Sequence, residues 1–432
     1  MSDLENMIDD NLRYLLKLLN KKNKGALRAS SKTLLRRINE LENTFKVWKI
    51  YDEVDKNTLR TIADIKIIQG LKISSLIGCA RVYKYFKYLF KKHEELETIR
   101  ICYTEWIAGF LTKIMRSAED EENILLTIFS NLNLRSISLY CMKSKGDIFS
   151  CLPSTLPNLE KLFLIDWRWL SVKGLIEILN RSRSNLRVLH LCYLPGVEEE
   201  VNSLPNLEKL TLFSCTNLTN RGLKEILRIS RNLRELDLSY SNITGVGVEE
   251  GVNSLPNLET LKLFECIYLT DGGLKGFLRL FGCKLKVLDI SQTNITGQGF
   301  KDEVISLPML EKLNMGCCYN LTDGGLKETL RISGSSIRVL DVSATNITEQ
   351  GFQDGVSLPM LEELNLEECD QLTDSGLLEI LSITGSRLKG VNVYGTNNDI
   401  QISTTVKNAL CTQYPSVQFK FEYDEPWMDH FP

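Results

Sequence analysis

One phrase recurs almost unchanged four times in the second half of this 432-residue chain. Each copy opens with Leu-Pro-x-Leu-Glu, and the copies start at Leu204, Leu255, Leu307 and Leu358, which are 51, 52 and 51 residues apart. The first half of a copy reads Leu-x-x-Leu-x-Leu-x-x-Cys-x-x-Leu-Thr, and the second half ends in three of them with Asn-Ile-Thr. A fixed period of this size indicates a repeat architecture and should be read before any local pattern.

Each half-phrase predicts a short strand followed by a return segment. The alternating leucines place one face of the strand in a core. In residues 269–278 a helical pattern follows, because Leu274, Phe277 and Leu278 share a face and Asp271 stands at the position of a helix cap. The matching cap positions in the other copies are Asn220, Asp323 and Asp374.

A strand and a helix within about 26 residues cannot bury their apolar faces alone, so stacked copies must complete the core. Because a return path follows every strand, neighbouring strands must run parallel. We therefore predict an α/β fold, a curved solenoid with a parallel inner sheet of about 14 strands and outer helices. The strand phrases start at Leu59, Leu96, Leu134, Leu159, Leu186, Leu207, Leu233, Leu258, Leu285, Leu310, Ile337, Leu361 and Leu388, and Tyr414 begins the last one.

The cysteine of the first half-phrase recurs in register at Cys215, Cys266, Cys318 and Cys369. With this spacing the chain resembles the leucine-rich-repeat proteins, and specifically their cysteine-containing form. The halves that end in Asn-Ile-Thr look like a shorter variant of the same repeat. The resemblance implies a right-handed horseshoe whose inner strands bind partner proteins.

The cysteines and the ends of the chain bear on the compartment. Four of the twelve cysteines recur at one inward position, which favours buried free thiols in a reducing compartment over disulfides. The first ten residues are acidic and carry no basic, apolar signal segment. No apolar run approaches the roughly 18 residues that span a bilayer. We expect a protein of the cytoplasm, or of the nucleus, that makes no use of a membrane.

Residues 4–43 predict three short helices ahead of the repeats. Three helices of this length before leucine-rich repeats resemble the F-box of F-box/LRR proteins. That resemblance implies binding of a Skp-type adaptor, which connects to a cullin. The residues that would bind the adaptor are Leu12, Leu15, Leu16, Leu19, Leu27, Leu34, Leu35 and Ile38. The alternative is that these helices only cap the open end of the solenoid.

Three regions follow from these patterns. Residues 1–45 form the F-box-like module, and residues 46–422 form the solenoid, with degenerate repeats over 46–135 and regular repeats and a cap over 136–422. Residues 423–432 are an acidic, aromatic tail that fits no repeat. Its apolar side chains need cover, so we expect the tail to fold back over the inner strands.

No catalytic or metal-binding arrangement is evident in the sequence. The three histidines, His93, His190 and His430, are far apart in a solenoid, whereas a metal site needs clustered His and Cys ligands. There is no phosphate-binding Gly-x-x-x-x-Gly-Lys motif. We therefore expect no cofactor, no metal and no enzymatic activity.

Asp237, Asp289 and Asp341 recur two strands apart and form an acidic row. A catalytic pair of carboxyl groups needs a separation of roughly 5 to 10 Å, which this row approaches. Because no other reactive group accompanies the row, we predict a ladder of solvated carboxylates.

The remaining candidate is the inner surface of the sheet, where the non-leucine strand positions point. We predict that its first half is an aromatic binding surface for a protein. The predicted residues are Tyr103, Tyr140, Phe163, Trp167, Tyr193, Phe213, Tyr240 and Phe264. The basic, aromatic stretch at residues 75–92 is interpreted as an outer helix, so no nucleic acid is expected.

These features lead to two hypotheses about function. In the first, the chain is the substrate receptor of a Skp–cullin–F-box ubiquitin ligase, and its concave face selects the protein substrate. In the second, it is a stand-alone scaffold or inhibitor that uses the same face without any ligase.

Overall fold

The computed structural model describes two compact units, residues 1–182 and 183–432. The described residues are 47–53, 70–75, 97–102, 125–140, 154–167, 170–182, 184–193, 203–250, 252, 255–301, 305–395 and 402–421. The predicted F-box-like module at 1–45 and the tail at 423–432 lie outside them. No helix in the described ranges has the length and apolarity needed to cross a membrane.

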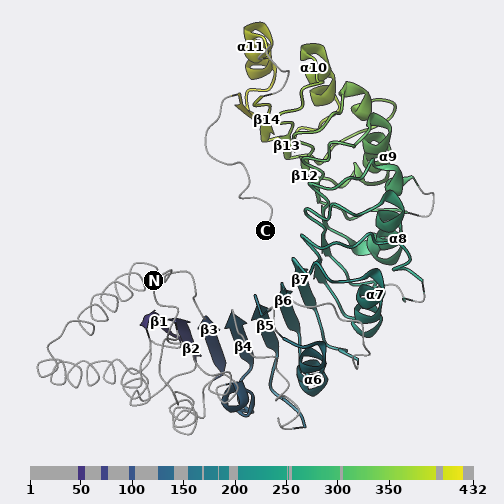
Figure 1. The fold of residues 1–432 in the computed structure, drawn as a ribbon. Coiled ribbons are helices and arrows are strands. Elements are labelled where there is room, and N and C mark those ends of the chain that lie inside the picture. The colour runs from purple at the N-terminus through teal and green to yellow at the C-terminus, as the bar shows by residue number, and fades with distance from the viewer. Residues whose placement is uncertain are drawn as a thin grey trace, which may run out of the picture. The chain divides into compact units, whose positions relative to one another are not determined.

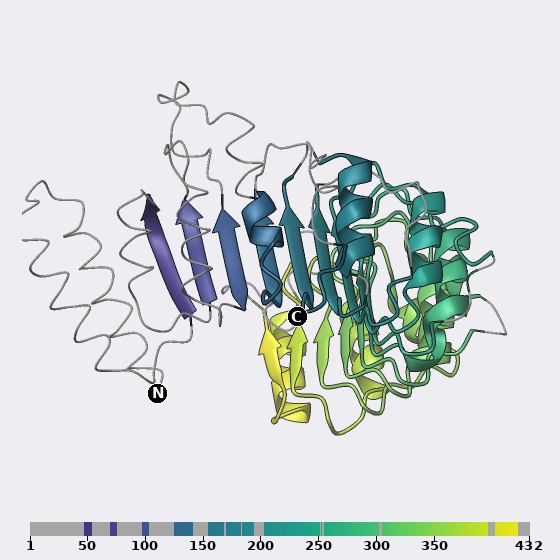
Figure 2. The same ribbon diagram turned by 90° about the horizontal axis from the view of Figure 1, so that it is seen from below.

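The first unit contains parallel strands that lie side by side in chain order, coloured purple to blue in Figure 2. These strands are β1 (Val47–Glu53), β2 (Gly70–Ser75), β3 (Thr98–Cys102), β4 (Ser136–Tyr140) and β5 (Lys161–Ile165). Residues 125–129 are helical, and helix α6 (Val172–Ser182) follows β5. The Ser171 hydroxyl caps α6 by accepting the Gly174 N–H at 3.0 Å.

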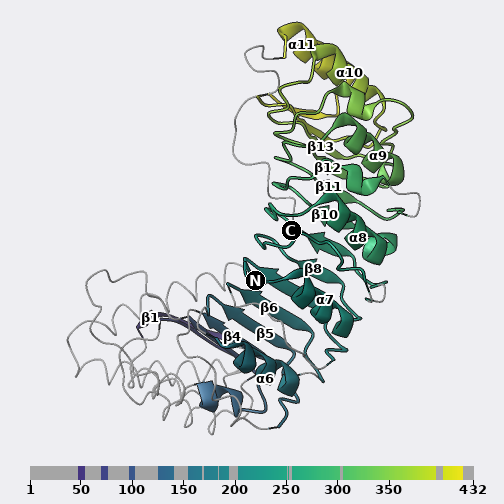
Figure 3. The same ribbon diagram turned by 45° about the vertical axis from the view of Figure 1, so that its right-hand side comes forward.

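The second unit repeats a strand and a return segment, and its strands pair parallel in chain order from β6 to β15. Figures 1 and 3 show the helices of this unit on one side of its sheet, which leaves the other sheet face open. The strands are β6 (Val188–Cys192), β7 (Lys209–Phe213), β8 (Glu235–Asp237), β9 (Thr260–Lys262), β10 (Val287–Asp289), β11 (Lys312–Asn314), β12 (Val339–Asp341), β13 (Glu363–Asn365), β14 (Gly390–Asn392) and β15 (Gln418–Lys420).

The return segments of the second unit alternate between long and short. Repeats that carry the cysteine return through an α-helix, whereas repeats with Asn-Ile-Thr return through turns or 3₁₀ helices. The α-helices are α7 (Asn220–Ile229), α8 (Asp271–Phe281), α9 (Asp323–Ser333), α10 (Asp374–Ser382) and α11 (Thr404–Gln413). The 3₁₀ helices are η2 (Gly282–Lys284), η3 (Gln298–Phe300) and η4 (Glu349–Phe352).

The strand positions predicted from the leucine phrases are confirmed. From Leu159 to Leu388, each strand begins two residues after the leucine or isoleucine that opens its phrase. The residues that the structure describes include 15 strands, whereas the repeat count predicts about 14. The difference arises before residue 76, where β1 and β2 flank the weak phrase at 59–67, which itself lies outside the described residues.

The core of the second unit lies between its sheet and its return segments. The strand leucines are fully buried, as are Leu274 and Phe277 of α8. The Phe277 and Phe281 rings stack with centroids 5.8 Å apart. Burial of each such side chain contributes about 1.5–3 kcal/mol, and the repeats share that core with both neighbours.

The helix caps differ from the prediction. The N-cap of α9 is Thr322, whose hydroxyl accepts the Gly325 N–H at 3.0 Å, and Thr219 and Thr373 cap α7 and α10 in the same way. Asp323 and its counterparts are instead the first helical residues. Threonine satisfies the free N–H as an aspartate would, so the adjacent carboxylate is available for another contact.

That other contact joins neighbouring repeats. Both carboxylate oxygens of Asp271 accept from the following Asn-Ile-Thr segment, one from the Thr296 hydroxyl at 2.7 Å and one from the Gly297 and Gly299 N–H groups at 3.2 Å. Asp323 accepts from the hydroxyl and N–H of Thr348 at 2.8 Å in each case. The carboxylates at the starts of α8 and α9 therefore clamp the next short repeat.

A second junction joins each short repeat to the next helix. Gly297 has φ +89° and lies against Gly325 of α9, where a Cβ added to Gly325 would lie 2.2 Å from the Thr296 carbonyl oxygen. Gly245 and Gly273 meet in the same way one pair earlier. These glycines are required because the two backbones touch.

A ladder of backbone hydrogen bonds links the strand ends. The residue that closes each strand turn has a left-handed backbone, as at Tyr240 (φ 62°), Glu265 (φ 54°) and Cys317 (φ 57°). Its N–H donates to a carbonyl of the next repeat, for example Tyr240 to Phe264 at 2.8 Å and Cys317 to Ser343 at 2.7 Å. The ladder extends the sheet pairing beyond the strands and fixes the direction of these side chains.

The predicted column of inward thiols is present. Cys215, Cys266, Cys318 and Cys369 are free and buried. Each thiol donates to a carbonyl of an earlier repeat, for example Cys266 Sγ to Leu238 O at 3.1 Å and Cys369 Sγ to Val342 O at 3.2 Å. Burial raises the pKa of Cys266 and Cys369 to about 12 and that of Cys318 to about 11. The thiols therefore stay protonated at neutral pH.

We expect Asp271→Ala to lower the free energy of unfolding by about 1–3 kcal/mol, because it leaves partly buried N–H groups of the next repeat without their acceptor. Urea denaturation followed by circular dichroism measures this. Asp271→Asn is the matched control, because Asn220 makes the same clamp to Thr244 and Gly245 in the first copy. An equal loss in both variants would contradict the clamp.

We expect Cys283 and Cys411, which are exposed, to react rapidly with iodoacetamide at pH 8, whereas the four buried thiols react only after denaturation. A rise in pKa from 9 to about 12 alone lowers the thiolate fraction about a thousandfold. Mass mapping of the alkylated peptides reads out each site. Rapid labelling of Cys266 or Cys369 in the native protein would contradict the buried column.

Candidate protein-binding surface

The open face of the second unit is the sheet face turned away from its helices. Strand pairing places its side chains in rows that run across the repeats. The middle row contains His190, Thr211, Asp237, Lys262, Asp289, Asn314, Asp341, Asn365, Asn392 and Lys420. Two further rows follow at the strand ends, where the aromatic residues lie.

Four predicted aromatic residues form one continuous strip on this face. The ring centroids are 6.4 Å apart for Tyr193 and Phe213, 4.8 Å for Phe213 and Tyr240, and 5.1 Å for Tyr240 and Phe264. These distances lie in the range where aromatic rings attract one another. We call these four residues the aromatic strip.

The aromatic strip is accessible and held in place. Tyr193 is 43 % exposed, and the other three rings are half-buried. Partial burial and the nearby Glu265 carboxylate raise the pKa of the Tyr240 phenol, which is therefore neutral at physiological pH. Because the backbone of Tyr240 is fixed by the ladder, its ring needs little ordering when a partner binds.

The other predicted aromatic residues are placed differently. Tyr140 and Phe163 are half-buried residues of β4 and β5 in the first unit. Trp167 is completely buried, so its prediction as a surface residue was wrong. A strand-end position indicates exposure only if the next loop turns away, and here the large indole fills the core instead. Tyr103 lies outside the described residues, as do the eight residues predicted to bind an adaptor.

The acidic row is not the solvated ladder that the sequence predicts. Asp341 is only 8 % exposed, and burial raises the pKa of Asp289. Each carboxylate accepts two hydrogen bonds from the serine two residues on, as Asp289 does from the Ser291 N–H at 3.1 Å and hydroxyl at 2.6 Å. Asn365 also donates to Asp341 at 3.0 Å. The carboxylates of the row therefore close the strand turns.

These side-chain turns coincide with most of the short strands, although β9 and β15 are also three residues long and carry Lys262 and Lys420 in the middle row. Strands β4 to β7 have five residues and carry Ser, Phe, His or Thr in the middle row. Strands β8 and β10 to β14 have Asp or Asn there and only three residues. The Asx oxygen takes the N–H two residues later, which ends the regular strand. The surface after β9 is therefore built on turns.

Three further exposed apolar residues lie in the second unit and were not among the predicted site residues. Ile267, Tyr268 and Tyr319 are 46 %, 55 % and 65 % exposed. They occupy the two variable positions of Cys-x-x-Leu-Thr, directly after the buried thiol. The sequence distinguishes these residues, because the equivalent positions in the copies at Cys215 and Cys369 are polar.

A histidine and a cysteine meet beside the aromatic strip. His190 Nε2 lies 3.0 Å from Cys192 Sγ, and both belong to β6. Burial lowers the pKa of His190 and raises that of Cys192 to about 12. Both groups are therefore neutral at pH 7, which leaves the thiol without the thiolate character of a nucleophile. Among the residues that the structure describes, no three His, Cys, Asp or Glu side chains are grouped to hold a metal.

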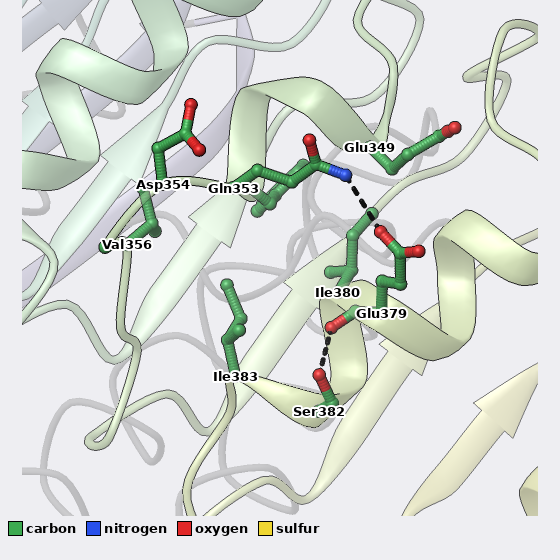
Figure 4. A pocket seen from close by; sticks show the side chains of 10 residues that line it. Glu349, Gln353, Asp354, Val356, Glu379, Ile380, Ser382 and Ile383 are labelled. Atoms are coloured by element: carbon green, nitrogen blue, oxygen red, sulfur yellow. Dashed lines mark hydrogen bonds between the residues drawn. The ribbon is translucent and has the colours of Figure 1, made fainter.

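A pocket of about 230 Å³ lies on the helix side, between η4 and α10 (Figure 4). Two of its polar side chains are paired: Gln353 Nε2 donates to Glu379 Oε2 at 2.9 Å, and Asp354 binds Lys327 at 2.6 Å, whereas Glu349 Oε2 is buried without a hydrogen-bond partner among the described residues. Ligand pockets are usually larger than about 300 Å³. The open face is therefore the better candidate for a binding site.

The comparison with protein families agrees with the observed repeats. The family model described as "Leucine Rich repeat" matches residues 230–250 and 357–381. The first range runs through β8, and the second runs from before β13 into α10. The chain therefore contains leucine-rich repeats and has the fold of a leucine-rich-repeat solenoid. The register of the strands extends the two matched repeats across the whole second unit, and the open face is the surface predicted to be concave.

Solved structures that are similar to this chain include two protein complexes and one internalin. The Rad7 and Elc1 complex in yeast gives 16 % identity over 98 % of this chain and 97 % of that chain, with a TM-score of 0.48. An internalin (inlF) from Listeria monocytogenes gives 14 % identity over 85 % and 90 %, with a TM-score of 0.49. The mouse RP105/MD-1 complex gives 15 % identity over 87 % and 71 %, with a TM-score of 0.43.

His190 generates a prediction about acid stability. Its folded pKa is below the unfolded value of about 6.5, so the unfolded state binds a proton first as the pH falls. The wild type should therefore lose stability between pH 7 and 5 relative to His190→Asn, which cannot titrate. Urea midpoints at several pH values measure the difference between the two proteins. A constant difference across that range would contradict the burial of the neutral imidazole.

Proposed function

We propose that this protein is the substrate receptor of a Skp–cullin–F-box ubiquitin ligase. The observation that carries the receptor role is the aromatic strip, an accessible apolar surface on a rigid repeat scaffold. Leucine-rich repeats support a role in protein interaction. The ligase context rests on the resemblance of residues 4–43 to an F-box.

In this role the chain binds two proteins and makes or breaks no bond itself. The eight apolar residues between Leu12 and Ile38 hold the adaptor, and the aromatic strip holds the substrate. Rigid aromatic side chains are efficient binding anchors because they bury a large area while few rotatable bonds are restricted. The receptor thereby brings the substrate to the rest of the ligase.

A scaffold or inhibitor would use the same open face without the adaptor. The aromatic strip would serve a scaffold or inhibitor as well as a receptor, because all four rings belong to the second unit and none to the N-terminal helices. Adaptor binding therefore decides between the two functions.

We expect Leu15→Asp combined with Leu16→Asp to lower recovery of the Skp adaptor and cullin with the tagged protein from cells about a hundredfold or more, because two apolar contacts become charged. Lys21→Asp with Lys22→Asp adds the same two carboxylates in the polar segment that follows and should retain the adaptor. Phe213→Ala with Phe264→Ala should retain the adaptor and lose the substrate. Equal adaptor recovery by all variants would leave the scaffold or inhibitor as the function.

A further inference from the structure

The end of the open face that is remote from the aromatic strip is negatively charged. Glu367 and Glu368 follow β13, and Glu368 is exposed. The Asn392 amide donates to Glu367 Oε2 at 2.7 Å, but the residues that the structure describes form no salt bridge to either carboxylate. Within the described part of the chain, neither carboxylate therefore has a salt-bridge partner.

Between the strip and these carboxylates the surface is made mostly of small side chains. Ser291, Gly316 and Ser343 occupy one row, and Gln292, Cys317 and Ala344 occupy the next. A Cβ added to Gly316 would lie 2.9 Å from Ser343 Oγ, so the row is closely packed without a larger residue. Ser291 and Ser343 already donate to Asp289 and Asp341 at 2.6 Å. This part of the face offers room for a chain.

The distance between the two ends follows from the sheet. Four strand spacings separate β9, which ends the aromatic strip, from β13. At about 4.8 Å per spacing they lie about 19 Å apart. A segment of about six extended residues spans that length.

We propose that the open face binds a protein segment with an apolar anchor at one end and a cluster of arginine or lysine residues about 19 Å away. The apolar anchor lies on the aromatic strip, and the basic side chains lie at Glu367 and Glu368. This inference rests on the proposed function, because it names the chemistry of the segment that the face selects. Unpaired carboxylates speed the approach of a basic partner and disfavour an acidic one such as a nucleic acid.

The test uses the full-length protein and three fluorescein-labelled peptides of eleven residues. Each carries tryptophan and leucine at one end and a glycine-serine spacer of six residues. The other end carries three arginines, three glutamines or three glutamates. Fluorescence anisotropy at low and moderate salt gives the dissociation constants. We expect the arginine peptide to bind about tenfold more tightly than the glutamine peptide and the glutamate peptide to bind most weakly, with the spread shrinking as salt is added.

Two charge variants locate the basic contact. Glu367→Gln with Glu368→Gln should weaken the arginine peptide about fivefold and leave the glutamine peptide unchanged, because two exposed ion pairs are removed. Glu328→Gln with Glu379→Gln is the matched control, since it changes the net charge equally on α9 and α10. If both double variants weaken the arginine peptide equally, the effect is net charge and the inference is overturned.

A third variant separates the inference from the function on which it rests. Phe213→Ala with Phe264→Ala should weaken all three peptides alike. If that variant weakens them but the peptides do not differ from one another, the face is a protein-binding site and the basic segment is wrong. If no peptide binds, or the aromatic variant binds as the wild type does, the inference and the binding role of the strip both fail.

Discussion

The structure of the second unit depends on one backbone hydrogen bond that is repeated after each strand from β6 to β13. A non-glycine residue adopts a left-handed conformation there, which costs about 1–2 kcal/mol. The bond from its N–H to the next repeat offsets that cost, as between Glu265 and Ser291 at 3.0 Å. Without the neighbour the conformation would lose its main support, so each repeat keeps its shape only inside the stack. The same bond directs Tyr193 and Tyr240 outward, and the binding surface is therefore a product of the stacking contacts.

The leucine pattern predicted most of the fold because it reports burial directly. Strand starts, parallel pairing and the inward thiols follow from which positions are apolar, and the structure has them. The caps were misjudged because threonine and aspartate stand side by side and both suit a helix start. The choice between them is made by the next repeat, where Thr296 and Thr348 hydroxyls reach the carboxylates. A contact 25 residues away is not visible in a local pattern.

Part of the candidate site was predictable because the leucine pattern also shows which strand positions point away from the core. Alternation indicated that Phe213 and Phe264 point away from the core, and register placed them near Tyr193 and Tyr240. It did not distinguish Trp167, which a loop brings into the interior, or show that Asp341 is enclosed by Ser343 and Asn365. Side-chain hydrogen bonds decide exposure at these positions, and their geometry depends on three neighbouring repeats at once.

The two kinds of junction have a consequence for how such a chain can lengthen. A long repeat reaches forward with Asp271 to the following short repeat, whereas the short repeat meets the next long one through Gly297 and Gly325. The junctions are therefore directional, and an aspartate–threonine junction alternates with a glycine–glycine junction along the chain. Loss or gain of a single repeat would join a clamp to a surface without its threonine, or a helix to a surface without its glycine. Only a cassette of two repeats, about 51 residues, can be inserted or removed with every junction intact. The period of the sequence is thus the smallest length by which this solenoid can grow.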